Sequence, residues 1–340
     1  MTERNHIAIV CLPQKEDFLT LIDKTLKTLK SEDSFVRPYD ETGVPGALIA
    51  LDTDDEAIPT IIVPDLHARV DFFEEILKFP LAQNDENPPT TIEEALKQKK
   101  AYLLCVGDGL HSEHRGKERW LQAEEMWMQN EPANKYICDE MAEGLSLMTR
   151  IMQCKCEYKE YFHFLRGNHE NILNQFFCGS MPFRKFASEG EMVKDFMLHV
   201  YGETITQKYA DFEHSLPLFA RGKNFLVSHA EPLRPYSEQE LIDGFLDDDL
   251  IRGLTWTAND KAQEDSVEIM LKTLLPHKED TIYFAGHRTV QGTHRLLRNN
   301  KFIQIHNQTE HFISIIHPNT AFNPLKNIYD TRTGTIAVLN

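Results

Sequence analysis

Long hydrophobic runs are missing from this 340-residue sequence, and none of its apolar stretches approaches the roughly 18 residues that span a membrane. The first residues also lack the basic region and long apolar segment of a signal peptide. We therefore expect no membrane partner and a cytoplasmic location. Low-complexity linkers and internal repeats are absent as well. We predict a single domain over residues 1–340, with an N-terminal extension at 1–50 and a helical insertion at 116–156.

Cysteine is scarce and scattered along the chain. The six cysteines stand at positions 11, 105, 138, 154, 156 and 178, and no two of them form a CxxC pair. Most lie in apolar or helical sequence, which favours reduced structural thiols over disulfides or a zinc knuckle. The cysteines therefore indicate neither a disulfide framework nor a thiolate metal site.

Positive charge is also in short supply, because 36 lysines and arginines face 53 aspartates and glutamates, for a formal net charge of −17. A protein that binds nucleic acid broadly needs a basic footprint, so we expect no nucleic-acid partner. The same negative field would repel an anionic substrate. A site that handled phosphate would need its own local positive charge, and metal ions could supply it.

What the sequence does contain is a series of short apolar runs, each ending at a polar side chain that can bind a metal ion. IPTIIVP, AYLLCVG and YFHFLRG precede Asp65, Asp108 and Asn168, while NFLVS and TIYFAG precede His229 and His287. The first three runs are each followed by helix-like sequence, as in strand–loop–helix units. The carboxyl ends of neighbouring strands meet at one edge of an α/β sheet, where ligands bind. These side chains should therefore lie close together.

The C-terminal part of the chain has a different pattern. KFIQIHN, HFISIIHP and GTIAVLN are typical of antiparallel strands joined by Asn and Gly turns. Residues 116–156 have the pattern of two helices broken around residues 130–132. The fold class predicted from both halves is α/β (α+β), a two-sheet mixed β-sandwich flanked by helices.

The polar residues at the strand ends form a chemically consistent set. Singly, each has an ordinary structural explanation: Asn168 is suited to cap a helix, and a histidine after a strand is usually a satisfied polar residue. Five such positions in order are harder to assign to chance. Two carboxylates, one amide oxygen and three imidazoles suit Mn²⁺, Fe²⁺, Fe³⁺ or Zn²⁺. Six ligands exceed one catalytic zinc site but fit two ions that share a carboxylate.

The ordered blocks PDLHAR, VGDGLHSEHRG, FLRGNHE, VSHAE and FAGHR resemble the signature blocks of calcineurin-like metallophosphoesterases. FLRGNHE, together with GLTWT at residues 253–257, is especially similar to the phosphoprotein (Ser/Thr) phosphatase branch. The resemblance implies a four-layer αββα fold and a hydrolase that uses two Mn, Fe or Zn ions. It also implies the metal ligands. The first ion would take Asp65 and His67, Asp108 would bridge both ions, and Asn168, His229 and His287 would complete the second.

The same resemblance implies how substrate is handled. His169 would be the general acid that protonates the leaving oxygen, a role that suits an imidazole with a pKa of about 6.5. Arg115 and Arg166 would contact phosphate oxygens, which an arginine fork binds in pairs. Arg288 follows a proposed ligand directly, so a phosphate contact and a plain surface charge explain it equally well.

The sequence departs from the family pattern at two places. His111 stands where the second block normally has a second Asp, which orients the general-acid histidine, and Glu113 is a candidate substitute as the partner of His169. The last block reads GHRT rather than Gly-His-x-His, so we expect the first ion to lack a fourth protein ligand. The other histidines have no matching partner pattern, and we expect them to be structural or at the surface: His163, His199, His214, His277, His306, His311 and His317.

These features predict a dinuclear phosphoesterase that hydrolyses phosphomonoesters through a metal-bridging hydroxide. The resemblance favours a Ser/Thr protein phosphatase-like activity on a phosphorylated protein or small molecule. One alternative is a dinucleoside polyphosphate hydrolase, since similar short bacterial relatives share these blocks. Another is a degenerate protein that holds phosphate or a partner without turnover, an alternative supported only by the altered second block.

Overall fold

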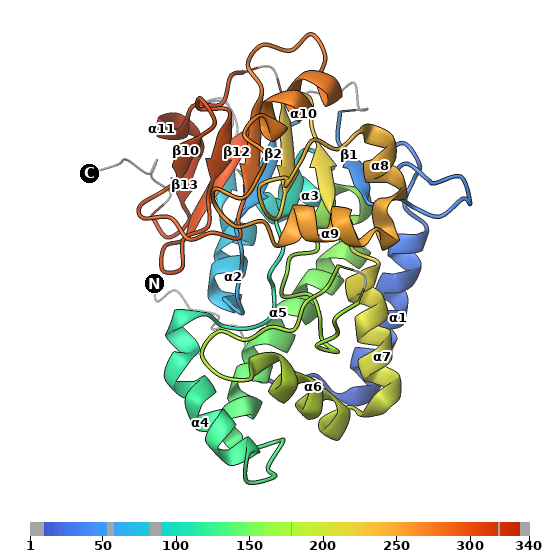
Figure 1. The fold of residues 1–340 in the computed structure, drawn as a ribbon, viewed down its shortest axis with the longest axis vertical. Helices are drawn as coiled ribbons and strands as arrows, with labels where there is room; N and C mark the ends of the chain where they lie inside the picture. The colour runs from blue at the N-terminus through green and yellow to red at the C-terminus, as the bar shows by residue number, and fades with distance from the viewer. Residues whose placement is uncertain (1–9, 53–57, 82–89, 178, 319, 334–340) are drawn as a thin grey trace.

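Two mixed β-sheets lie at the centre of the molecule, and helices cover their outer faces (Figure 1). The computed structural model describes residues 10–52, 58–81, 90–177, 179–318 and 320–333. A sheet of six strands has the order β1 (Leu48–Ala50), β7 (Phe219–Arg221), β8 (Phe225–Ser228), β9 (Ile282–Ala285), β11 (Phe302–Gln304) and β10 (Arg295–Leu297). A sheet of five has the order β13 (Ile328–Asp330), β12 (Phe312–Ile316), β2 (Thr60–Val63), β5 (Tyr102–Cys105) and β6 (Phe162–Phe164). The predicted mixed two-sheet architecture is confirmed.

The remaining elements are helices and one short ribbon, β3 (Pro80–Leu81) with β4 (Thr90–Thr91). The helices are α1 (Lys15–Lys30), α2 (Val70–Lys78), α3 (Ile92–Lys97), α4 (Lys117–Trp127), α5 (Lys135–Tyr158), α6 (Glu189–Val200), α7 (Gly202–His214), α8 (Glu238–Asp243), α9 (Asp248–Thr255), α10 (Ser266–Leu274) and α11 (Pro324–Asn327). Among the residues described, no helix combines the length and apolar character needed to cross a bilayer.

Alternating side chains of the central strands separate three hydrophobic layers. On β5, Leu103 packs on the helix side of its sheet, whereas Leu104 packs between the two sheets. On β8, Leu226 faces the helices of the other side, whereas Val227 faces the inter-sheet layer. Because both faces of each sheet are buried, these strands read as continuous apolar runs. The three hydrophobic layers thus lie between four structural layers, in the order helices, sheet, sheet and helices.

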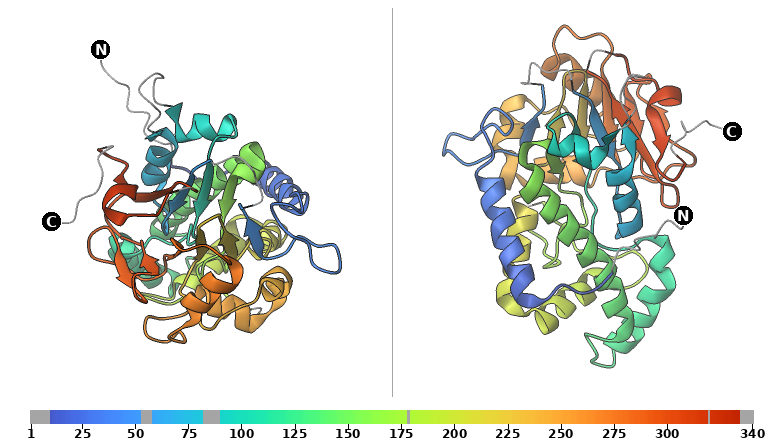
Figure 2. Two further views of the ribbon diagram at one scale, coloured as in Figure 1. Left: turned by 90° about the horizontal axis from the view of Figure 1, so that it is seen from above. Right: turned by 180° about the vertical axis from the view of Figure 1, so that it is seen from behind.

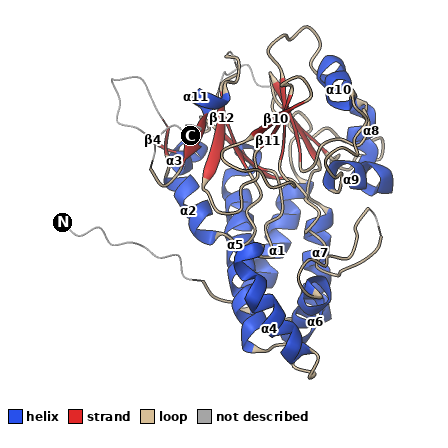
Figure 3. Cartoon of the chain, turned by 60° about the vertical axis from the view of Figure 1, so that its left-hand side comes forward, coloured by secondary structure: helices blue, strands red, loops and turns tan. Residues whose placement is uncertain are grey.

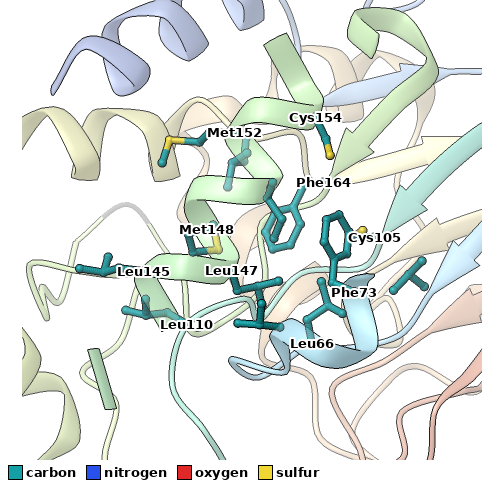
Figure 4. Packing of buried hydrophobic residues seen from close by; sticks show 14 of the residues in the cluster. Leu66, Phe73, Cys105, Leu110, Leu145, Leu147, Met148, Met152, Cys154 and Phe164 are labelled. Carbon is teal, nitrogen blue, oxygen red and sulfur yellow. The ribbon is translucent and has the colours of Figure 1, made fainter. Parts of the chain in front are cut away.

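The helical layer on the five-stranded sheet is the larger of the two. Figure 3 shows α1, α5 and α7 lying next to one another, with α4 and α6 at the end farther from the sheets. Figure 2 shows α1 alongside α5 from behind. Met148 and Met152 of α5, Phe164 of β6, Leu66 and Phe73 belong to one buried cluster beneath the candidate site (Figure 4). The site therefore rests on a closely packed support.

The two helices expected within residues 116–156 are α4 and α5, with the break between Trp127 and Lys135. The directions of the C-terminal strands agree only in part with the predicted antiparallel pattern. β12 is antiparallel to both β2 and β13, as expected, but β11 is antiparallel only to β10 and runs parallel to β9. The predicted strand GTIAVLN lies outside the described residues. The described cysteines are free thiols, as expected.

Candidate metal centre

The five ligand-bearing runs form strands whose carboxyl ends meet at one edge of the two sheets. β2, β5 and β6 are mutually parallel neighbours, and β8 is parallel to β9. The loops that follow these strands carry Asp65, Asp108, Asn168, His229 and His287. Because the strands are parallel, their loops emerge on the same side.

Three residues in these loops have backbone conformations that residues with side chains rarely adopt. The φ angles of His67, Asp108 and His287 are +43°, +53° and +61°. Non-glycine residues in this left-handed region cost about 1–3 kcal/mol each and cluster at functional sites. The surrounding fold therefore holds the candidate ligands in place at an energetic cost.

Two glycines leave the room that the carboxylates need. A Cβ on Gly286 would lie 1.7 Å from Asp65 Oδ1, and a Cβ on Gly167 would lie 2.3 Å from Asp108 Oδ1. Neither position could carry a larger residue without displacing a carboxylate. The glycines of the third and fifth motifs thus have a direct steric function.

One carboxylate oxygen, Asp108 Oδ2, lies among three imidazoles. It is 3.7 Å from His67 Nε2, 3.4 Å from His229 Nε2 and 3.7 Å from His169 Nε2. The other oxygen, Oδ1, accepts a hydrogen bond from the backbone N–H of His169 at 2.9 Å. Asp108 is therefore the central acid of the cluster.

Asn168 joins the two histidines that come from the six-stranded sheet. Its Oδ1 lies 2.9 Å from His229 Nε2 and 2.8 Å from His287 Nδ1. His229 Nδ1 lies 2.9 Å from the carbonyl oxygen of Val106, which can only accept, so Nδ1 carries the proton. Its Nε2 then presents a lone pair to the oxygens of Asn168 and Asp108. Acceptors that meet without a proton between them suit a cation.

On the opposite side of Asp108, His67 Nδ1 lies 3.0 Å from the carbonyl oxygen of His111, so its Nε2 is again the unprotonated nitrogen. That Nε2 lies 3.9 Å from Asp65 Oδ2. A further histidine, His306, lies with its Nδ1 3.8 Å from the same oxygen. Asp65, His67 and His306 form one group able to hold a metal, and Asp65, Asp108 and His229 form another.

Several polar atoms of this cluster are buried without a partner among the described residues. They are Asp65 Oδ1, His287 Nε2 and His306 Nδ1. Leaving a buried polar atom unsatisfied costs about 1–3 kcal/mol. Carboxylate oxygens, an amide oxygen and neutral imidazole nitrogens are the donors that borderline divalent and trivalent ions take. The residues present therefore fit a two-metal site.

Burial also changes the charge state of the cluster. Desolvation, and then the neighbouring carboxylates of Glu170 and Asp65, raises the pKa of Asp108 well above its ordinary value. Desolvation lowers the pKa of His67 to about 4 and that of His287 well below its usual range. Burial thus favours the neutral form of the His67 and His287 imidazoles, which is the form that binds a metal, and a nearby cation would favour ionisation of the Asp108 carboxylate.

Comparison with known proteins identifies this arrangement. The family model for calcineurin-like phosphoesterases matches residues 58–312, which is most of the chain and contains all five motifs. The chain belongs to the calcineurin-like phosphoesterase family. It is accordingly a metallophosphoesterase, a hydrolase that acts on phosphoric ester bonds.

The chain is also similar to solved structures, the first of which agrees with this family in fold. A protein serine/threonine phosphatase from Saccharomyces cerevisiae is similar with a TM-score of 0.59 and 15% identity, covering 93% of this chain and 88% of that one. A cold-active protein-tyrosine phosphatase of a psychrophilic Shewanella has a TM-score of 0.46 and 12% identity, covering 79% and 77%. A search of the curated proteins found no significant match.

His169, for which the resemblance implies the role of general acid, has another histidine as its neighbour. His169 Nδ1 lies 3.2 Å from Nδ1 of His111, and Phe183 packs against both rings. Glu113, which the sequence suggested as that partner, forms no hydrogen bond or ion pair with His169. Its carboxylate lies 3.1 Å from His306 Nε2 and also pairs with Lys185. A three-residue turn of 3₁₀ helix, His114–Gly116, follows Glu113.

The three candidate phosphate arginines differ in their surroundings. Arg115 pairs with Glu143 and donates to the carbonyl oxygens of His67 and Ala68 at 3.2 and 3.1 Å. Arg166 is buried and donates to Ser180 Oγ at 2.6 Å. Arg288 is half-buried beside His287, and its Nε has no hydrogen-bond partner among the described residues.

His306 is the residue of this site that the sequence analysis assigned to structure or surface. The signal was present, because KFIQIHN is another apolar run that ends at a polar residue able to bind a metal. The pattern of antiparallel strands at the C-terminus nevertheless favours a structural role for this histidine. Two other histidines with an expected structural or surface role have partners of their own. His163 Nδ1 lies 3.5 Å from Lys155 Nζ, and His311 pairs with Glu75.

Proposed function

We propose that this metallophosphoesterase is a dinuclear, metal-dependent phosphomonoesterase with Ser/Thr protein phosphatase-like activity on a phosphorylated protein or small molecule. The observation that carries the proposal is the meeting of carboxylate, amide and imidazole donors around Asp108. Asp65, His67 and Asp108 would hold one ion. Asp108, Asn168, His229 and His287 would hold the other. When bound, two ions would supply Lewis-acid stabilisation of the phosphoryl group and activation of the attacking water.

The protein's own groups would then orient the substrate and move the proton. His169 Nε2 lies 3.7 Å from Asp108 Oδ2, the same oxygen that lies near the candidate ligands His67 and His229. A leaving oxygen there would receive its proton from this imidazole. Glu113, instead of assisting His169 directly, would act on the first-ion side of the site.

Arg288 is the arginine best suited to bind a phosphate oxygen, because its Nε lacks a partner among the described residues. Arg115 and Arg166 remain proposed contacts whose present hydrogen bonds would have to be exchanged for phosphate. These local cations, with the two ions, would offset the repulsion of an anionic substrate by a chain of net charge −17.

The test is turnover of para-nitrophenyl phosphate by protein loaded with Mn²⁺, Fe²⁺ or Zn²⁺. We expect Asp108→Asn and His229→Ala to abolish turnover, whereas the matched control His277→Ala, at an exposed turn, should retain it. Full activity of the Asp108 and His229 variants would refute the ligand assignment. Loss of all metal binding by the wild type would instead support a degenerate binding protein.

A second measurement separates the two enzymatic alternatives. A panel of phosphoserine and phosphothreonine peptides is compared with dinucleoside polyphosphates at equal concentrations. Higher kcat/KM on the phosphopeptides is expected. Preference for the dinucleotides would replace the phosphomonoesterase proposal with a dinucleoside polyphosphate hydrolase.

A further inference from the structure

His306 is brought to the candidate metal centre by a strand outside the five recognised motifs. It lies two residues beyond the end of β11, which is parallel to β9 in the same sheet, with Gln304 opposite Ala285. Its ring centroid lies 5.2 Å from that of His67. The end of β11 therefore opens at the same edge as the end of β9, which carries His287.

The surroundings of His306 determine which ring nitrogen can bind an ion. The side chain is 1% exposed, and its Nε2 lies 3.1 Å from Glu113 Oε2. A carboxylate accepts, so the proton lies on Nε2 and the lone pair on Nδ1. Nδ1 is buried, has no hydrogen-bond partner among the described residues, and lies 3.8 Å from Asp65 Oδ2.

We propose that His306 is a fourth protein ligand of the first metal ion, held in its tautomer and orientation by Glu113. The inference rests on the proposed dinuclear function. Two donor atoms that each lie about 2.0–2.2 Å from one ion are roughly 3–3.5 Å apart. The distances from Asp65 Oδ2 to His306 Nδ1 and to His67 Nε2 are 3.8 and 3.9 Å, so a contraction of a few tenths of an ångström would bring both into that range.

This assignment gives Glu113 a positioning role. A histidine that ligates a metal commonly donates its other N–H to a carboxylate or a carbonyl, which fixes the ring and raises its basicity. His306 has Glu113 in that place, and His67 has the carbonyl oxygen of His111. The two imidazoles of the first ion would thus each have their own support.

The assignment also predicts which metals the first position selects. With His306, that position has two imidazoles and two carboxylates instead of one imidazole and two carboxylates. Imidazole ligands favour Zn²⁺, Co²⁺ and Fe²⁺, whereas Mg²⁺ and Ca²⁺ take mainly oxygen ligands. Removal of His306 should therefore weaken the binding of Co²⁺ more than the binding of Mn²⁺.

The experiment is a titration of chelator-treated full-length protein with Co²⁺, followed by calorimetry and by visible absorption, which reports the ligands of the ion. Wild type should bind two equivalents. His306→Ala should weaken one of them by about 100-fold or more and change its absorption bands, while Glu113→Gln should weaken it by about 10-fold. The control His311→Ala, whose native partner is Glu75, should bind like wild type.

The outcomes distinguish this proposal from the proposed function. Thermal unfolding of each variant in chelator first shows that the metal-free fold is intact. Two equivalents bound by His306→Ala with wild-type affinity and spectrum would overturn the assignment and leave the dinuclear enzyme standing. A wild type that binds no ion would overturn both.

Discussion

His169 and His111 meet through their Nδ1 atoms, so one ring must donate and the other accept. When His169 is protonated, its Nδ1–H can donate to the lone pair of His111, and its Nε2–H is left for the leaving oxygen. The family pattern has a carboxylate at this place, whereas His111 carries no negative charge. Burial, and then His67 and His111, lower the pKa of His169 well below its usual range. Phe183 excludes water from the pair by packing on both rings.

At the scale of a residue, we predict that His169→Gln lowers kcat by about 10²–10⁴-fold on an alkyl phosphate. The loss on para-nitrophenyl phosphate should be smaller, because nitrophenolate departs without needing a proton. Steady-state kinetics on both substrates, with metal content measured in parallel, provides the check. Loss of an ion from the variant would instead make His169 a metal ligand.

Gly286 provides a steric prediction at the same scale. An alanine there would place its Cβ 1.7 Å from Asp65 Oδ1, so the carboxylate must move. Gly286→Ala should lose at least one of two bound ions, measured by elemental analysis after dialysis. Gly43→Ala is the control: its φ is +81°, but its Cβ would meet nothing within 4 Å. Equal metal content in both variants would contradict the steric argument.

At the scale of an element, the start of α5 depends on one side chain. Asn134 Oδ1 accepts hydrogen bonds from the backbone N–H groups of Tyr136 and Ile137, and its Nδ2 donates to Ala123 and Glu131 carbonyl oxygens. This cap also ties α4 to α5. Both helices border the loop that carries His111 and Glu113.

Replacing that cap should destabilise the protein measurably. We expect Asn134→Ala to lower the free energy of unfolding by about 1 kcal/mol or somewhat more, since a lost cap costs about 0.5–2 kcal/mol. Asn134→Asp should lose less, because it keeps the accepting oxygen at the helix N-terminus. Urea denaturation of the two variants measures the difference. An Asp variant less stable than the Ala variant would contradict it.

At the scale of the whole molecule, the segment before the first motif is part of the packed structure. α1 packs against α5 and α7, and β1 pairs with β7 at the edge of the six-stranded sheet. Between them, Glu32 pairs with Arg37 at 2.8 Å and with Lys155 of α5, and all three side chains are buried. A buried ion pair of this kind is sensitive to the loss of either partner.

We therefore predict that Glu32→Gln lowers the free energy of unfolding by about 3–5 kcal/mol at neutral pH, because it leaves Lys155 buried without its anion. Burial opposes ionisation of Glu32, but Lys155 and Arg37 outweigh it and lower its pKa from 4.5 to about 2. This contribution is full above pH 4.5 and is lost as pH falls through about 2.

The stability difference between wild type and Glu32→Gln should accordingly narrow between pH 4.5 and 2. Thermal unfolding over this range measures it in metal-free protein, so that ligand protonation does not contribute. Ser31→Ala is a neighbouring exposed control and should follow wild type. A difference that stays constant with pH would contradict the role of the carboxylate.

The sequence was most informative where function depends on local order. Each of the five motifs combines a short apolar strand with a polar loop, and both halves can be read from adjacent residues such as Leu165 and Asn168. The two-sheet fold followed from the same strands. Partners that come from distant elements could not be predicted this way. Glu143 of α5, for example, forms an ion pair with Arg115.

The sequence by itself determined the set of candidate ligands, since Asp65, His67, Asp108, Asn168, His229 and His287 follow apolar strands in the order of a known family. Only the tertiary structure decided which other residues lie next to these candidate ligands. β11 pairs in parallel with β9, and this long-range pairing carries His306 to the candidate metal centre, where its Nε2 lies 3.1 Å from Glu113 Oε2. Strand direction depends on which distant strand supplies the hydrogen bonds, and no run of neighbouring residues encodes that choice alone.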